Sequence, residues 1–229
     1  MISCHMPVDP IYLENLEPGK CYHIYNRTNN KELLFRCEEN KRYFMQQADY
    51  YLSGILDLYG WCLLSNHFHF CVKMKERELV CKYIEAIPPA EKTITEIKFL
   101  NNSITTEMLA AKTFTRFFQS FSNSFNKMYL RKGNLFHKPF KRVWVRDDEQ
   151  FRKSLVYIHT NPIKHGLTHD FENYQWSSWS EYMKKKSEIK IIKEVFQKFG
   201  GKAAFIAAHQ VHQSFLGLPT LEGWQPYFF

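Results

Sequence analysis

Two apolar runs separated by a short polar turn constrain the fold of this chain more than any other stretch. They cover residues 60–64 and 67–73, with Ser65-Asn66 between them. Strand-like runs joined by so short a polar segment predict a β-hairpin. Along the second run His67 and His69 alternate with phenylalanines. Both imidazoles therefore lie on one face of the strand, about 6 to 7 Å apart.

The His67-Phe68-His69 spacing can seat one metal ion between two imidazoles. The motif is short, however, and two histidines on a half-buried strand also occur as ordinary hydrogen-bonded residues. Both interpretations stay open on this stretch alone. Because the histidines open their strand, we expect them at a strand end that a ligand can reach.

The remaining hydrophobic periodicity predicts an alternation of strands and helices. A strand at residues 21–27 and a helix at 38–59 precede the hairpin, and a helix at 114–131 and a strand at 141–146 follow it. The acids at 147–149 suit a helix start, and Pro162 predicts an end near Thr160. This order predicts an α+β fold, with a ferredoxin-like (RRM-like) antiparallel-rich sheet and helices on one face.

The chain divides into a main part and a tail. We interpret residues 1–182 as one domain with an insertion at about 74–112, and residues 183–229 as a small helical C-terminal appendage. Lys184-Lys185-Lys186 reads as a linker, and Gly200-Gly201 splits the tail into two short helices. His209 and His212 are one helical turn apart and could bind metal, but nothing else supports that interpretation.

Hydropathy and cysteine usage suggest where the protein works. No apolar run reaches the 18 or so residues that a membrane span needs, and the N-terminus lacks a signal-peptide pattern. We therefore expect no membrane partner and a cytoplasmic location. The six cysteines include no Cys-x-x-Cys pair, so they read as reduced and structural.

Positive charge is concentrated in one segment. Residues 113–153 hold ten Lys/Arg against three acids, in a chain whose formal net charge is +8. These cations are interleaved with phenylalanine, tyrosine and tryptophan, which suits a polyanion with stackable bases. A solvated helix face over a phenylalanine core would read the same way, and both interpretations stay open.

A tyrosine and an amide share one face of the last predicted core helix. Tyr157 and Asn161 are four residues apart, so their side chains lie about 5 to 6 Å from one another at Cβ. If that face packs on the strand with His67 and His69, both reach the same site. A tyrosine nucleophile needs help there, because a reference pKa near 10 leaves a deficit of about 4 kcal/mol at pH 7. Tyr157 could equally be a packed helix aromatic.

With these landmarks in order, the sequence resembles the single-tyrosine HUH transposases, and specifically the REP-associated tyrosine transposases. It departs from their pattern at Ser65, where a proline is usual, in the 74–112 segment and in the tail. The resemblance rests on five stretches: Gly19-Lys20-Cys21-Tyr22-His23-Ile24-Tyr25-Asn26-Arg27, Gly60 through His69, Gly133-Asn134-Leu135-Phe136 with Phe140-Lys141, Tyr157 through Gly166, and Tyr174-Gln175-Trp176-Ser177-Ser178.

The resemblance implies a DNA transposase that cuts and rejoins single-stranded or hairpin DNA through a covalent 5′-phosphotyrosine. It makes Tyr157 the nucleophile, and His67, His69 and Asn161 the ligands of a magnesium or manganese ion. Imidazole ligands favour manganese, and magnesium is more abundant in cells. We expect a monomer or homodimer, whose predicted DNA-binding residues are Arg27, Arg116, Lys138, Lys141, Arg142 and Arg146.

Two other functions remain open on the sequence. The first is a DNA-binding regulatory protein in which this site is vestigial. The second is a metal-dependent phosphodiesterase that activates water and forms no covalent intermediate. A tyrosine-linked DNA adduct would distinguish the transposase from both.

Overall fold

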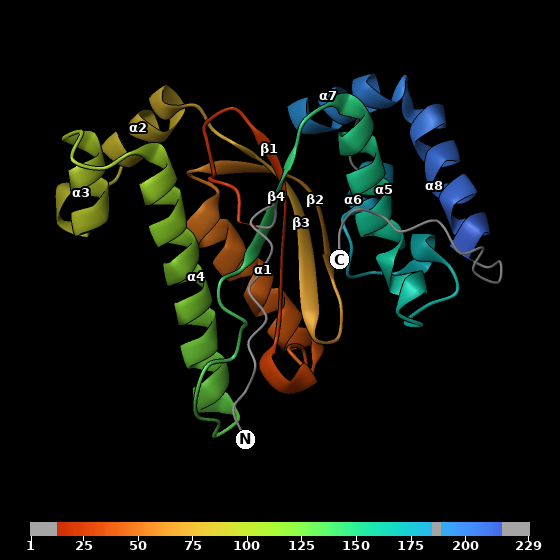
Figure 1. Ribbon diagram of the computed structural model, residues 1–229, viewed down its shortest axis with the longest axis horizontal. Helices are drawn as coiled ribbons and strands as arrows, with labels where there is room; N and C mark the ends of the chain where they lie inside the picture. Colours follow the sequence, from red (N-terminus) through yellow and green to blue (C-terminus); the bar gives the residue numbers. More distant parts are fainter. Residues whose placement is uncertain (1–12, 185–188, 217–229) are drawn as a thin grey trace.

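The computed structural model describes residues 13–184 and 189–216 (Figure 1). Within them, four strands form one antiparallel sheet in the order β2-β3-β1-β4. This is the strand order of a ferredoxin-like core, and the predicted α+β class is confirmed. The strands are β1 (Cys21–Arg27), β2 (Leu56–Leu63), β3 (His67–Met74) and β4 (Lys141–Val145).

Helices α1 (Glu38–Leu52) and α4 (Thr106–Met128) cover one face of the sheet (Figure 1). Strand alternation sends Tyr22 and Ile24 of β1 to this face, where they join the buried aromatic cluster of the two helices. Phe44 of α1 lies at its centre, with its ring 5.0 Å from that of Phe117 on α4. This packing gives the sheet a rigid support on one side.

Helix α5 (Asp148–Lys164) covers the opposite face of the sheet, which corrects one detail of the predicted fold. Helices on one face only had been expected. The second face carries its own buried residues, including Cys62 and Cys71 of the hairpin, and these pack against α5. An apolar strand that is buried on both sides needs a helix on each face, so the sheet is the middle of three layers.

The first helix ends earlier than its periodicity predicts. Helix α1 ends at Leu52 and β2 begins at Leu56, whereas a helix to residue 59 and a strand within residues 60–64 had been expected. Ile55 and Leu58 fit a helical stripe as well as a strand, so the apolar pattern could not separate the two elements. The predicted hairpin is confirmed, with Leu64 N donating to His67 O at 2.9 Å.

The segment predicted as an insertion contains regular structure. It holds α2 (Arg77–Glu85) and α3 (Ile94–Leu100), with a 3-10 turn at Pro89–Glu91 between them. Helix α4 begins at Thr106, eight residues before the predicted start, because Thr105 caps it by accepting from Met108 N. Further short turns lie at Asn29–Lys31 and Phe171–Asn173.

Helix α5 continues through Pro162 to Lys164, so the predicted end near Thr160 is wrong. The bias of a proline against helix at the preceding residue is overridden by packing, because residues 154–162 are all buried. Helix α8 lies against this part of α5, and its His212 is hydrogen-bonded to Thr160 at 3.0 Å.

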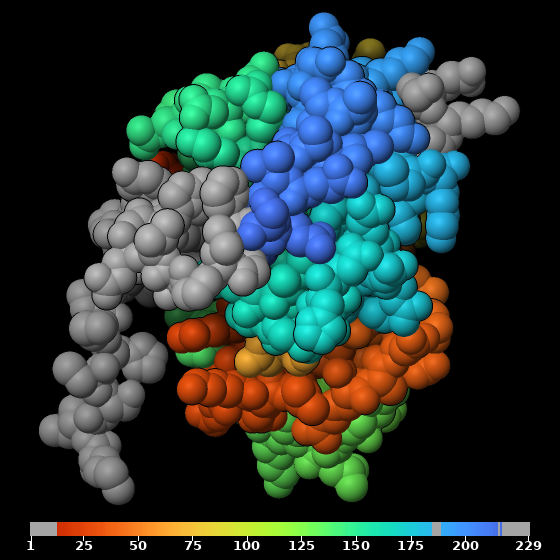
Figure 2. Space-filling view, turned by 90° about the vertical axis from the view of Figure 1, so that its right-hand side faces the viewer, coloured from red at the N-terminus to blue at the C-terminus, as the bar shows by residue number. Residues whose placement is uncertain are grey.

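The predicted tail helices are α7 (Lys190–Phe199) and α8 (Lys202–Leu216), and α6 (Trp179–Lys184) precedes them. Figure 2 shows α7 and α8 in blue over the face of the molecule that carries α5. The split at Gly200-Gly201 is confirmed, since Gly200 adopts the left-handed conformation that ends α7. Two lysines of the predicted linker, Lys185 and Lys186, lie outside the described residues. No helix in the described part of the chain could cross a bilayer.

Candidate functional site

Strand pairing gathers polar side chains on the face of the sheet that α5 covers. His67 and His69 project from β3, and His23 and Tyr25 project from β1. Tyr25 lies directly opposite His69 in the register, and opposite residues of an antiparallel pair share a face. The predicted pair of imidazoles on one strand face is therefore present, with ring centroids 5.2 Å apart.

Helix α5 brings Tyr157 to these histidines. Its start is set by Asp147, whose side chain accepts from Gln150 N at 2.8 Å. Gly60 lets the helix approach the sheet closely, because a Cβ there would lie only 2.2 Å from Leu155 Cδ1. The Tyr157 ring then meets the His69 ring edge-to-face at 5.7 Å. The condition left open by the sequence, that this helix face packs on the histidine strand, is met.

The two histidines present the same nitrogen to the site. His67 Nδ1 is hydrogen-bonded to Asn66 Oδ1 at 2.7 Å, and His69 Nδ1 to His23 Nε2 at 2.9 Å. Nε2 is therefore the nitrogen of each ring that can bind a metal ion. His69 Nε2 is buried and has no hydrogen-bond partner among the described residues. A buried polar atom in this state indicates a missing partner, such as an ion or a water.

Burial keeps these imidazoles neutral. It lowers the pKa of His67 to about 3, and His165 and Arg27 add to the decrease. Burial also lowers the pKa of His69 well below its usual value, with a smaller effect from His23. A neutral imidazole has the lone pair that a metal ion needs, so both histidines can bind metal at pH 7.

Tyr157 is poorly prepared to ionise by itself. Its side chain is 5% exposed, and burial raises the pKa of its hydroxyl above the usual value. The neighbouring Asn161 amide opposes part of that increase. Neither polar atom of Asn161 makes a hydrogen bond of standard geometry with the described residues. Positive charge from outside the protein would favour the phenolate here.

The donor set fits a catalytic ion with open coordination positions. Two imidazoles that share one ion, at about 2.1 Å per bond, bring their ring centres about 5 Å apart, which matches the His67–His69 pair. Asn161 can add an amide oxygen. In the described ranges no group of three or more His, Cys, Asp or Glu side chains is placed to hold a metal ion, so the protein would supply two imidazoles and an amide. Substrate oxygens could therefore complete the coordination.

Besides Tyr25, three residues near the site were missed by the sequence analysis. His23 touches His69, His165 lies with its ring 4.6 Å from that of His67, and the Lys164 ammonium lies 5.8 Å from the Tyr157 ring centroid. Two spacings in the sequence could have indicated the histidines among them. His23 alternates with Tyr25 on β1, and His165 follows Asn161 by four residues, as Asn161 follows Tyr157. His165 is exposed and His67 half-buried, so the group of histidines reaches the surface at this edge.

The predicted DNA-binding residues do not all lie at the site. Arg27 pairs with His67 in the sheet register, and Lys141 lies over the Tyr25 ring at 5.7 Å. Arg116 projects from α4, the helix on the opposite face of the sheet. The Arg142 guanidinium donates hydrogen bonds to Glu14 O and Phe140 O. Lys138 is exposed beside the cis Pro139, and Arg146 lies over Trp144.

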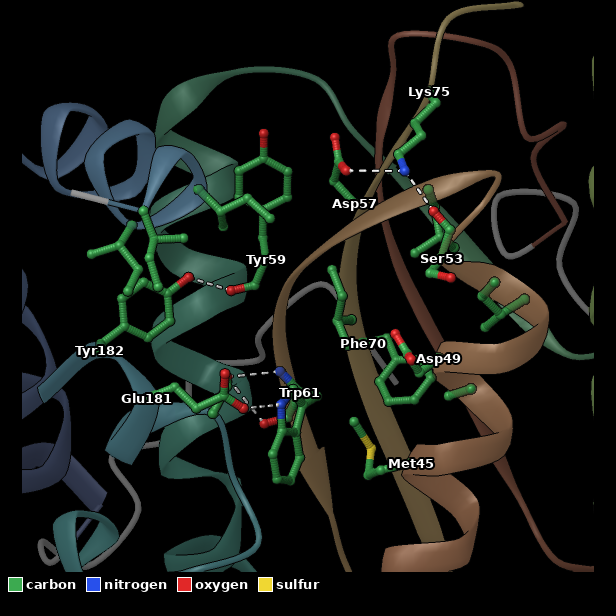
Figure 3. Close-up of a pocket in the computed structure, with 18 residues that line it drawn as sticks. Met45, Asp49, Ser53, Asp57, Tyr59, Trp61, Phe70, Lys75, Glu181 and Tyr182 are labelled. Atoms are coloured by element: carbon green, nitrogen blue, oxygen red, sulfur yellow. Dashed lines mark hydrogen bonds and ion pairs between the residues drawn. The ribbon is translucent and has the colours of Figure 1, made fainter. Parts of the chain in front are cut away.

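The tail histidines and the cavity of Figure 3 lie apart from this site. His209 is hydrogen-bonded to His159 at 2.9 Å and to Phe205 O at 2.7 Å, and His212 is hydrogen-bonded to Thr160. Both histidines thus pack the tail against α5. A cavity of about 390 Å³ lies beside β2 and includes Trp61 and Glu181 (Figure 3). Its carboxylates, which include Asp49 and Asp57, disfavour a DNA phosphate.

Comparison with known proteins leaves the family of this chain open. No family model matches the sequence, and no curated protein matches it significantly. One solved structure with a related fold is a REP-associated tyrosine transposase bound to a REP hairpin. The two chains superpose with a TM-score of 0.48 and share 12% sequence identity. The match covers 74% of this chain and 82% of the other. A likeness of this size establishes no activity for the chain.

Proposed function

We propose that this chain is a metal-dependent DNA transposase that cleaves and rejoins single-stranded hairpin DNA through a covalent bond to Tyr157. The observation that supports this most is the contact of the Tyr157 and His69 rings at 5.7 Å, with Asn161 one helical turn further along α5. The candidate nucleophile is therefore a direct neighbour of one candidate metal ligand. The sequence resemblance described above assigns these residue types the same roles.

The reaction exchanges one phosphate ester for another. The Tyr157 oxygen attacks a DNA phosphorus, so an oxygen–phosphorus bond forms while the bond to the 3′-oxygen breaks. The phenol loses its proton, and the departing 3′-oxygen gains one. The product is a 5′-phosphotyrosine and a free 3′-hydroxyl. Because the number of ester bonds is unchanged, a 3′-hydroxyl can reverse the step without an external energy source.

The side chains around Tyr157 prepare this step. His67 and His69 would hold a divalent ion through Nε2, and Asn161 through its amide oxygen. When bound, the ion would withdraw negative charge from the scissile phosphate. Two imidazoles suit manganese better than magnesium, although magnesium stays the abundant candidate. Arg27 and Lys141 lie where they can bind the adjoining phosphates.

Labelled oligonucleotides test the proposal. The protein is incubated with single-stranded hairpin DNA and Mn²⁺, and the products are separated on a denaturing gel. DNA labelled at its 3′ end should migrate with the protein, and DNA labelled at its 5′ end should appear as a shortened fragment with a 3′-hydroxyl. Cleavage without an adduct would establish the phosphodiesterase. Binding without cleavage would support the regulatory protein.

Removal of either metal-binding imidazole should abolish cleavage. We expect His67→Ala and His69→Ala to lose adduct formation by a factor of about 100 or more, since two protein ligands cannot hold the ion well. His169→Ala is a control, because His169 is exposed and belongs to the loop after α5. The adduct yield per unit time measures the effect. A His69→Ala protein with the wild-type rate would place the metal elsewhere.

Binding of single-stranded DNA should weaken as the salt concentration rises. The slope of the logarithm of the binding constant against the logarithm of the salt concentration should depend on Arg27. Each phosphate contact contributes about 0.7 to the log–log slope for a single strand. We expect Arg27→Gln to lower the slope by about that amount. Arg42→Gln should leave it unchanged, because Arg42 lies on α1, across the sheet, and is paired with Glu38 and Glu39. Fluorescence anisotropy at several salt concentrations measures both. Equal slopes for all three proteins would remove Arg27 from the DNA surface.

A further inference from the structure

His23 is a buried histidine that the proposed reaction does not yet use. It lies in the middle of β1 and is inaccessible to solvent. Its Nε2 is 2.9 Å from His69 Nδ1, and the two rings stack with centroids 5.0 Å apart. It also meets the Tyr157 ring edge-to-face at 6.0 Å. One side chain therefore contacts both a candidate metal ligand and the candidate nucleophile.

The chemistry of neutral imidazoles gives this contact a direction. A neutral ring has one N–H donor and one acceptor nitrogen. If His69 binds an ion through Nε2, the proton of His69 must be on Nδ1. That N–H then donates to His23 Nε2, which requires His23 to carry its own proton on Nδ1. Histidine ligands of metals usually donate to a carboxylate, a carbonyl or a water in this way, and here the acceptor is an imidazole.

The geometry around His69 restricts its ring on two further sides. The Tyr25 ring stacks on it at 5.3 Å with an interplanar angle of 26°. The Tyr157 ring approaches almost perpendicularly, at 89°. Tyr25 therefore sets the plane of the His69 ring, but stacking alone does not distinguish Nδ1 from Nε2. The hydrogen bond to His23 makes that distinction.

We propose that His23 is a positioning residue that holds His69 in its Nδ1–H tautomer, with Nε2 directed to the metal position beside Tyr157. This inference rests on the proposed function and assigns His23 no contact with DNA. It gives a role to the hydrogen bond between two buried imidazoles on β1 and β3. It also predicts that the acceptor at position 23, rather than an imidazole as such, is what His69 requires.

Two variants of similar size separate an acceptor from simple packing. His23→Gln keeps an acceptor oxygen, and His23→Leu fills the space without one. Ile24→Leu is the matched control, because Ile24 is the next residue of β1 and faces the α1 and α4 layer. Mn²⁺ binding to the DNA-free protein is measured from the electron paramagnetic resonance signal of unbound Mn²⁺. Long-range proton–nitrogen NMR spectra of the metal-free protein report the tautomer of His69.

We expect wild type, His23→Gln and Ile24→Leu to show the Nδ1–H tautomer of His69 and to bind Mn²⁺ with similar affinity. His23→Leu should mix the tautomers and bind Mn²⁺ about 10- to 100-fold more weakly. An Nε2–H tautomer in the wild type would overturn the inference, whether or not His23→Leu folds. So would a folded His23→Leu protein with unchanged tautomer and affinity. A wild type that binds no Mn²⁺ would contradict the proposed function, and the tautomers would still decide the role of His23.

Discussion

Tyr157→Phe should abolish the covalent protein–DNA adduct and leave both folding and DNA binding intact. The change removes one oxygen and little volume from a side chain that is 5% exposed, so the packing of α5 on the sheet is preserved. The hydroxyl is the only atom of Tyr157 that can attack phosphorus. Residual adduct should therefore be below detection, against a wild-type adduct visible on a denaturing gel.

Tyr25→Phe is the control for this prediction. Among the described tyrosines, Tyr25 also contacts the His69 ring, by stacking on it at 5.3 Å, and it is thus a rival nucleophile that the structure reveals. We expect the Tyr25→Phe protein to form the adduct. If the adduct survives in Tyr157→Phe and disappears in Tyr25→Phe, the nucleophile is on β1. Cleavage by Tyr157→Phe without any adduct would favour attack by water.

The metal-free protein should lose a large part of its stability between pH 6.5 and pH 5. Burial lowers the pKa of His23 to about 3 and that of His209 to about 4, from a reference value of 6.5. It also holds the pKa of His69 and His159 well below that value. The unfolded chain therefore binds more protons than the folded one in this range. Stability is complete above pH 6.5 and falls as the pH drops from there toward the folded-state pKa values.

The size of the acid effect follows from proton linkage. His23 and His209 each remove about 2 kcal/mol of unfolding free energy by pH 5, so these two remove about 4 kcal/mol. That amount is a large part of the stability of a typical domain, about 5 to 15 kcal/mol. Urea unfolding in the presence of EDTA, followed by circular dichroism at pH 8, 6 and 5, measures it. An unfolding free energy that is equal at pH 8 and pH 5 would contradict the prediction.

A single substitution tests the origin of the acid effect. His209→Gln should reduce the slope of unfolding free energy against pH by about 1.4 kcal/mol per pH unit between about pH 6 and pH 5, because one proton-binding site is removed from the unfolded chain. The slope is informative even if the lost contacts to His159 and Phe205 lower the stability at every pH.

Local patterns in the sequence predicted the sheet well. The alternation in residues 21–27 matched β1, and the polar pair Ser65-Asn66 marked the turn of the hairpin. A strand pattern of period two has no helical alternative when it is short, aromatic and bounded by turn residues. The predictions failed where two patterns overlap, as at Ile55 and Leu58. They also failed at Pro162, where burial between the sheet and α8 outweighs a local backbone bias.

The sequence by itself determined that two imidazoles share a strand face and that Tyr157 and Asn161 share a helix face, because both follow from the repeat of one element. Only the tertiary structure decided that these two faces meet. That meeting depends on the close approach of α5 over Gly60 and on its burial under α8, which are contacts between residues far apart in the chain. The pairing of His23 with His69 was hidden for the same reason. It joins two strands 46 residues apart, and a hydrogen bond across a sheet leaves no periodicity in either strand.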